Sequence, residues 1–179
     1  GDLIRVMGKV TQFNGLTEFT ADSLAVISSA NPVALPITVS SLIEAQESQL
    51  IQLNGLRMVN TAWPATGSNM NVAVTNGVDT FNMFIDKETN IDGTTAPNTL
   101  FNVVGIQSQF DNSAPYTSGY QIVPRRITDI VAINNPTIAY SSASGTIAEN
   151  GGTFNLPLTL SSNMQSTEDV KIFISDRKS

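Results

Sequence analysis

The chain has 179 residues, 41% of them hydrophobic, which is typical of a globular protein with one or two domains and a sizeable core. Its net charge of −6 argues against a surface that neutralises many phosphates. Histidine and cysteine are absent, which excludes Ser-His-Asp triads, Cys-His pairs and zinc sites built from thiolates or imidazoles. No apolar run is long enough to predict a membrane-spanning helix.

Short runs rich in β-branched residues, separated by Asn, Gly, Ser and Thr, predict an all-β protein. In chain order we expect strands at Leu3–Phe13, Thr17–Ile27, Leu50–Val59, Met70–Thr75, Thr80–Asp86, Leu100–Phe110 and Tyr120–Ile133. The pattern within Val39–Leu50 predicts a helix of one or two turns. A linker at Asn134 to Pro136 precedes further strands, predicted at Thr137–Tyr140, Gly145–Ala148, Thr153–Leu160 and Val170–Ser175.

An internal repeat gives the first information on architecture. The stretch GKVTQFNG, from Gly8 to Gly15, is echoed ninety-seven residues later by GIQSQFDN, from Gly105 to Asn112. Five strands are predicted between Leu50 and Ile133, enough for one small barrel, and the repeat aligns the start of the chain with the last two of them. The chain is therefore predicted to open with the end of one barrel and to continue with a complete one.

Three glycines lie inside predicted strands, at Gly8, Gly55 and Gly105. Glycine in a strand marks a bulge or a close backbone approach, and a small closed barrel needs strands that bend sharply. We expect each of the three to lie at such a point.

The segments GDLIRVMGKVTQFNGLTEF, ITVSSLIEAQESQLIQLNGLRMV and LFNVVGIQSQFDNSAPYTSGYQIVPRRITDI resemble an OB-fold domain family. That family occurs beside catalytic domains in secreted bacterial nucleases and in other bacterial surface proteins. The resemblance implies a five-stranded Greek-key barrel over residues 35–134, preceded at 1–34 by a β-hairpin from a partial OB unit. It also implies a secreted or cell-surface bacterial protein in which this module accompanies other domains.

A second resemblance begins at Pro136. The stretch TIAYSSASGTIAENGGTFNLPLTLSSN is similar to the first half of a Calx-beta-type sandwich repeat, so residues 135–179 are predicted to be a partial β-sandwich. Such repeats can bind calcium, and the resemblance places Glu149 at a position where the family often has an acidic ligand.

The residues favour a non-enzymatic protein without a cofactor. No Walker-type or dinucleotide-type glycine loop is present, and no Ser-x-x-Lys pair supports a serine nucleophile. The densest acidic stretch, DKETNID, spaces Asp86, Glu88 and Asp92 like the start of a calcium loop. It lacks the glycine and the late glutamate of such a loop, so a solvated turn is the favoured interpretation, with weak calcium binding as the alternative.

A ligand surface can be placed by the way OB folds bind, on the second and third strands and the loops beside them. Strand alternation predicts that Phe81, Met83 and Ile85 face the core, which leaves Asn82 and Phe84 outside. Trp63 and Tyr116 lie in the two flanking loops, and Arg57, Arg125 and Arg126 are candidate backbone contacts. These seven residues predict a stacking surface for single-stranded nucleic acid or a glycan. The alternative, which we favour, is that Trp63 and Tyr116 anchor loops and Phe84 covers a barrel end. One of Arg125 and Arg126 would then pair with Asp129 or another carboxylate.

Two functions from different classes follow. One is a binding module that assists a nuclease by holding nucleic acid, or that holds a glycan or protein. The other is a structural spacer in an array of β domains. In either case the strands of residues 3–27 and 137–175 are predicted to dock on the central barrel or to exchange between chains, giving a dimer, and neighbouring domains of the same chain are expected partners.

Overall fold

The computed structural model describes residues 1–133, 138–140 and 158–160. They fall into two units, Gly1–Ile133 and Asn134–Ser179. In the second unit β10 (Ile138–Tyr140) pairs antiparallel with β11 (Leu158–Leu160). The strands predicted at Gly145–Ala148 and Val170–Ser175, and the candidate ligand Glu149, lie outside the described residues.

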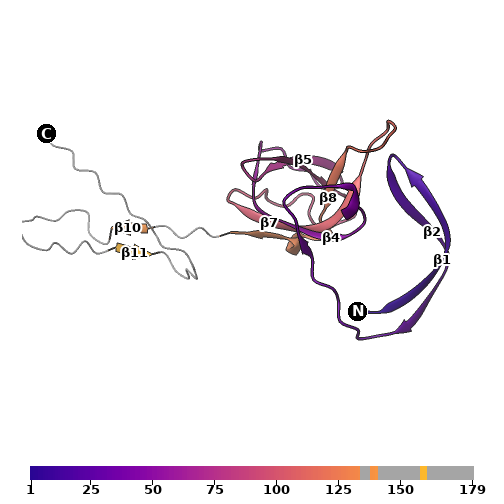
Figure 1. Cartoon of the computed structure of the whole chain (residues 1–179). Coiled ribbons are helices and arrows are strands. Elements are labelled where there is room, and N and C mark those ends of the chain that lie inside the picture. Colours follow the sequence, from indigo (N-terminus) through magenta and orange to yellow (C-terminus); the bar gives the residue numbers. More distant parts are fainter. Residues whose placement is uncertain (134–137, 141–157, 161–179) are drawn as a thin grey trace, which may run out of the picture. The chain divides into compact units, whose positions relative to one another are not determined.

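The first unit contains a closed five-stranded barrel of the OB type (Figure 1). Its strands are β4 (Leu50–Met58), β5 (Met70–Thr75), β6 (Thr80–Ile85), β7 (Phe101–Gln109) and β8 (Tyr120–Val123), with β9 (Ile130–Ala132) continuing beyond β8. The order is β4-β5-β6-β8-β7, the β6–β8 pair is parallel, and β4 pairs with β7 to complete the barrel. The predicted all-β barrel is therefore confirmed.

Alternation along the strands builds the core. Phe81, Met83 and Ile85 of β6 are buried as predicted, while Phe84 between them is half-buried on the outer surface. On β7 every second residue is fully enclosed, and Phe101 and Val103 have no exposed surface. The barrel is closed by this apolar interior, because each strand contributes one apolar face to the same enclosed volume.

The glycines perform the roles predicted for them. Gly55 has a φ of +65° and lies where the β4–β7 register shifts between Leu53 and Leu56, so it forms a bulge that bends β4. Gly105 lies where β7 and β8 approach closely: a Cβ added there would stand 2.6 Å from the Val123 carbonyl oxygen. Only glycine fits that approach without displacing backbone.

Of two predictions about local structure, one is confirmed in its shorter form and one was wrong. Within Val39–Leu50 the predicted helix is a single 3-10 turn, η1 (Glu44–Gln46), which follows the two-residue strand β3 (Ile37–Thr38). The predicted strand Tyr120–Ile133 is divided into β8 and β9 by a second 3-10 turn, η2 (Ile127–Asp129). Pro124 directly follows β8, and its lack of an amide hydrogen suits the break.

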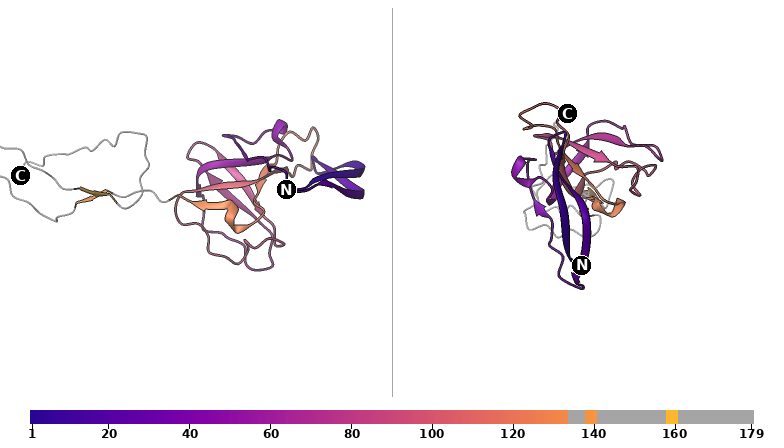
Figure 2. Two further views of the ribbon diagram at one scale, coloured as in Figure 1. Left: turned by 90° about the horizontal axis from the view of Figure 1, so that it is seen from below. Right: turned by 90° about the vertical axis from the view of Figure 1, so that its right-hand side faces the viewer.

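A long β-hairpin precedes the barrel. It consists of β1 (Leu3–Phe13) and β2 (Leu16–Ser28), joined by Asn14 and Gly15, and Figure 2 shows it as a curved two-stranded ribbon. Asn14 and Gly15 both have positive φ, as a two-residue hairpin turn requires. A register shift between Met7 and Gly8 marks a bulge at the first repeated glycine.

We expect Gly105→Ala to destabilise the barrel by about 1–3 kcal/mol, since the added methyl group must displace the β8 backbone. Urea unfolding followed by circular dichroism measures this change. The matched control is Ser108→Ala on the outer face of β7, which should alter the free energy of unfolding by less than about 0.5 kcal/mol. Equal stability of Gly105→Ala and the parent chain would contradict the role assigned to Gly105.

Candidate functional site

Two hollows on the barrel unit are large enough to hold a small ligand. One, which we call the hairpin groove, has a volume of about 560 Å³. It lies where the hairpin turn meets the outer face of the barrel and is lined by Phe13, Leu16, Glu18, Asn71, Phe84, Asp86, Ser108, Gln109, Phe110, Gln121 and Val123. Both the volume and the mixture of aromatic and polar side chains are typical of ligand sites.

The aromatic part of the groove comes from both copies of the repeat. Phe13 ends β1 and Phe110 directly follows β7, and their rings meet edge to face with centroids 6.4 Å apart. Phe84 reaches the groove from the outer face of β6. The two repeated phenylalanines are each more than half exposed, so their rings can contact a ligand.

The polar part includes a row of amides on the outer surface of three strands. The Asn82 side-chain amide on β6 donates to Asn71 Oδ1 on β5 at 3.1 Å and to Gln121 Oε1 on β8 at 3.4 Å. Asn71 and Gln121 line the groove, and Asn82 lies between them. These hydrogen bonds hold the groove floor in one arrangement, with further amide donors and acceptors left for a ligand.

The hairpin is joined to the barrel by hydrogen bonds near its turn, one at the β7–β8 loop and one at Glu47 before β4. The Asp111 amide donates to the Asn14 carbonyl oxygen at 2.7 Å, and the Thr17 amide donates to Glu47 Oε1, also at 2.7 Å. Within the loop, the buried Gln109 amide donates to the carbonyl oxygens of Tyr116 and Ser118. The rim of the groove is thus shaped by hydrogen bonds.

Asp111 organises the same loop through its carboxylate. It accepts hydrogen bonds from the amide and hydroxyl groups of both Ser118 and Ser113. These bonds, the Ser118 hydroxyl foremost, hold the pKa of Asp111 below its usual value, although burial acts in the opposite direction. The charged form of Asp111 is therefore part of the folded loop.

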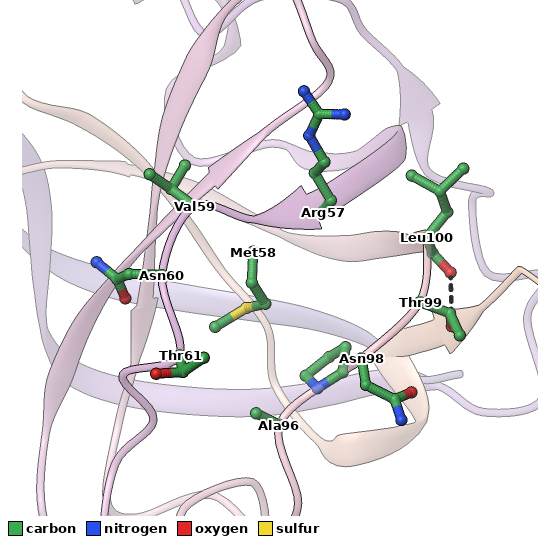
Figure 3. Close-up of a pocket in the computed structure, with 10 residues that line it drawn as sticks. Arg57, Met58, Val59, Asn60, Thr61, Ala96, Asn98, Thr99 and Leu100 are labelled. Atoms are coloured by element: carbon green, nitrogen blue, oxygen red, sulfur yellow. Dashed lines mark hydrogen bonds between the residues drawn. The ribbon is translucent and has the colours of Figure 1, made fainter.

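The second hollow, which we call the β4-end pocket, has a volume of about 710 Å³ (Figure 3). Arg57 to Thr61 line one side of it and Ala96 to Leu100 the other. In Figure 3 the Met58 side chain points toward Thr61, whereas the Arg57 guanidinium extends in the opposite direction. The lining side chains are mainly short or apolar, with Asn60 and Asn98 as the polar groups beside Arg57.

The structure separates the residues of the predicted stacking surface. Phe84 lines the hairpin groove and Asn82 supports its floor, but Arg57 lies at the β4-end pocket. Trp63 is half-buried against the core and its indole nitrogen donates to Thr94 Oγ1 at 3.3 Å. Tyr116 contributes its carbonyl oxygen to the Gln109 side chain. The anchor interpretation of Trp63 agrees with its contacts, whereas the bond at Tyr116 involves only its backbone.

The two adjacent arginines pair with a carboxylate. Arg125 contacts Asp129 through Nε at 2.9 Å and through Nη2 at 3.0 Å, and its backbone amide donates to the same carboxylate. Arg126 Nε lies 3.8 Å from Asp129 Oδ1. Burial alone would raise the pKa of Asp129, but the bonds from Arg125 outweigh it and lower the pKa. The predicted pairing with Asp129 is confirmed, and it stabilises the turn between β8 and β9.

The candidate calcium residues are engaged in turns. Asp86 Oδ1 accepts the Glu88 amide at 2.8 Å, and Asp92 Oδ2 accepts the Gly67 amide at 2.5 Å. Over the part of the chain that the structure describes, no three acidic side chains are grouped as a metal site would require. Asp86, Glu88 and Asp92 therefore do not form a common ligand set in this structure.

Several groove residues were missed by the sequence interpretation, chiefly Phe13, Leu16, Glu18 and Asn71. Asn71 could have been found, because alternation along β5 places it on the same outer face as Phe84, its cross-strand partner. The hairpin residues could not, because nothing in the sequence places the hairpin turn beside β6 and β8.

The chain matches no protein-family model, no curated protein and no solved structure. Among the described residues, no helix is long and apolar enough to cross a membrane. The fold and the geometry of the two hollows therefore carry the functional argument.

We expect the loop held by Asp111 to lose stability in acid. An unfolded aspartate has a pKa of about 3.9. The folded pKa is lower, so this stabilisation is complete above the unfolded value and is lost as the pH falls through the folded one. Urea unfolding of the parent and of Asp111→Asn between neutral pH and acid should show a smaller fall in the variant. An Asp79→Asn variant, altered at an exposed carboxylate in the β5–β6 turn, is the matched control.

Proposed function

We propose that the barrel is a non-catalytic binding module that holds an uncharged, hydroxyl-rich chain, an oligosaccharide, in the hairpin groove. The observation that carries the proposal is the lining of the groove: three phenylalanines, three amides and two carboxylates, with no Lys or Arg among its residues. OB barrels bind oligosaccharides as well as oligonucleotides on this strand face.

The chemistry of the lining suits hydroxyl groups. Each sugar hydroxyl can both donate and accept a hydrogen bond. Carboxylates such as Glu18 and Asp86 only accept, whereas the amides of Asn71 and Gln121 can do both. The apolar faces of sugar rings can lie against the exposed rings of Phe13, Phe84 and Phe110, which contribute contact area at little entropic cost.

A nucleic-acid strand fits this groove less well. Phosphates accept hydrogen bonds, carry negative charge and are bound mostly by Lys and Arg. The groove offers Glu18 and Asp86, which repel them, and the whole chain carries a net charge of −6. Binding of single-stranded nucleic acid on the face around Phe84, which the family resemblance implies, stays a prediction.

We propose further that the hairpin groove binds a sugar chain without cleaving it. The chain has no His or Cys, and a glycosidase would need two carboxyl groups, one of them a general acid in an apolar environment. Glu18 is exposed and Asp86 already accepts the Glu88 amide. These features favour binding over hydrolysis.

A spacer function is the second candidate, and the contacts of the hairpin turn favour it. The bonds from Thr17 to Glu47 and from Asp111 to Asn14 join the hairpin to the barrel. Such contacts would restrict the orientation of successive β units in a secreted multidomain bacterial protein, which is the setting that the family resemblance implies.

Isothermal titration with cellohexaose, chitohexaose, xylohexaose and maltohexaose tests the binding proposal. We expect at least one to bind with a dissociation constant below about 1 mM, the weak end of specific recognition. Phe84→Ala should weaken it by about tenfold or more through lost ring contact. Arg57→Ala, at the other hollow, should leave it unchanged, and no sugar should be cleaved.

Fluorescence anisotropy with a labelled single-stranded oligonucleotide at low salt is the experiment that could contradict the oligosaccharide proposal. Binding of the oligonucleotide that Phe84→Ala weakens, with no response to any of the four sugars, would contradict an oligosaccharide site in the hairpin groove. Failure of every ligand would leave only the spacer function.

A further inference from the structure

The hairpin β1–β2 has one apolar face and one polar face. Directly paired residues of antiparallel strands point to the same side. The pairs Ile4–Val26, Val6–Leu24 and Val10–Phe19 therefore share one face, to which Gly8–Ala21 also belongs. The other face carries the pairs Arg5–Ala25, Met7–Ser23, Lys9–Thr20 and Thr11–Glu18.

The apolar face is open to solvent among the described residues. Val10 is 70% exposed, Leu24 61% and Val26 55%. Contiguous apolar surface of this kind is rare on a monomer and marks an interaction site. A two-stranded hairpin alone is also marginally stable, so the face needs a partner.

The strand register shows what kind of partner. In the hairpin Gln12 pairs with Thr17, and at the equivalent place in the barrel Gln109 pairs with Tyr120. The correspondence continues along both strands: Val10–Phe19 matches Gln107–Ile122, Val6–Leu24 matches Val103–Ile130, and Ile4–Val26 matches Phe101–Ala132. Two connections differ: the β7–β8 loop is longer than the two-residue hairpin turn, and the β8–β9 connection is longer than its counterpart in β2.

The glutamine at the end of the first strand also has the same role in both copies. Gln12 Nε2 donates to the Gly15 carbonyl oxygen in the hairpin turn. Gln109 Nε2 donates to the Tyr116 and Ser118 carbonyl oxygens in the β7–β8 loop. The hairpin is thus built as β7, β8 and β9 are built.

In the barrel the central part of this same face is covered. Phe101, Val103 and Ile122 have no exposed surface, because they close against the inner faces of β4, β5 and β6. Their hairpin counterparts Ile4, Val6 and Phe19 are equally apolar but lack that cover among the described residues.

We propose that the apolar face of β1–β2 is the closing surface of a second barrel, and that its partner is a three-stranded antiparallel sheet of the β4–β5–β6 type. A second copy of this chain does not supply such a sheet, since its own β4, β5 and β6 are already closed by β7 and β8. Phe13, Leu16 and Glu18 of the groove lie on the opposite face of the hairpin, so this inference does not depend on the groove ligand.

A fusion protein tests the proposal. The repeat offset aligns Asn98 with Gly1, so a copy of residues 35–97 placed directly before Gly1 positions its three strands as they stand before β7. The chain has no cysteine, which allows a single reporter thiol at Val10→Cys on the apolar face or at Thr11→Cys on the polar face. The rate of reaction with an aromatic disulfide reagent measures the exposure of each thiol.

In the unfused chain both thiols should react at similar rates. In the fusion the Val10→Cys thiol should react at least about tenfold more slowly, because reaction then requires local opening of the covered face. The reaction rate of Thr11→Cys should change little. Adding Leu24→Asp to the fusion should restore fast reaction at Val10→Cys, because a charge on the apolar face would have to be buried and so weakens docking of the added sheet. Ser23→Asp on the polar face should leave the slow reaction unchanged.

Two results would overturn the proposal. The first is an equal rate for Val10→Cys with and without the added sheet. The second is protection of Val10→Cys in the unfused chain that grows with protein concentration alongside a dimer in light scattering, because a second copy would then cover the face.

Discussion

The closure of the barrel depends on strand β7. It pairs with β4 on one edge and with β8 and β9 on the other, and every second side chain along it is buried. Gly105 allows β8 to approach where a side chain would meet the Val123 carbonyl oxygen. A bulge at Gly55 lets β4 bend around to the same strand. These two glycines therefore lower the cost of bending and closely packing the strands that form the closed ring around the apolar interior.

The hairpin before the barrel has the same structural features as β7 and β8, but its apolar face is exposed. It has a glycine at its bulge, a glutamine that ties its turn, and an apolar face in the register of β7 and β8. In the barrel that face is enclosed, whereas in the hairpin the described residues leave it open. Burial of apolar surface is the dominant favourable contribution to folding. The same sequence pattern therefore forms part of an enclosed core in the barrel and an exposed apolar interaction surface in the hairpin.

The hairpin groove arises where these two parts meet. Phe13 and Phe110 hold equivalent positions in the repeat and pack edge to face there. The outer faces of β5, β6 and β8 contribute amides, and Glu18 and Asp86 contribute carboxylates. The groove is therefore rich in groups that match hydroxyls and poor in the cations that match phosphates, which is the basis for preferring an oligosaccharide to a nucleic acid.

The sequence by itself determined the strands, the barrel and the places where glycine is needed, because alternation and turn residues are local signals. It also identified Phe84 as an outward aromatic and Asp129 as an arginine partner. It was wrong about Tyr120–Ile133, which the 3-10 turn η2 divides into β8 and β9 after Pro124. Only the tertiary structure decided that the hairpin turn lies beside β6 and β8, that Trp63 faces the core and that Arg57 lies apart from Phe84. The reason is physical: sequence periodicity tells which face a side chain occupies, whereas contacts between distant segments depend on how the closed barrel packs.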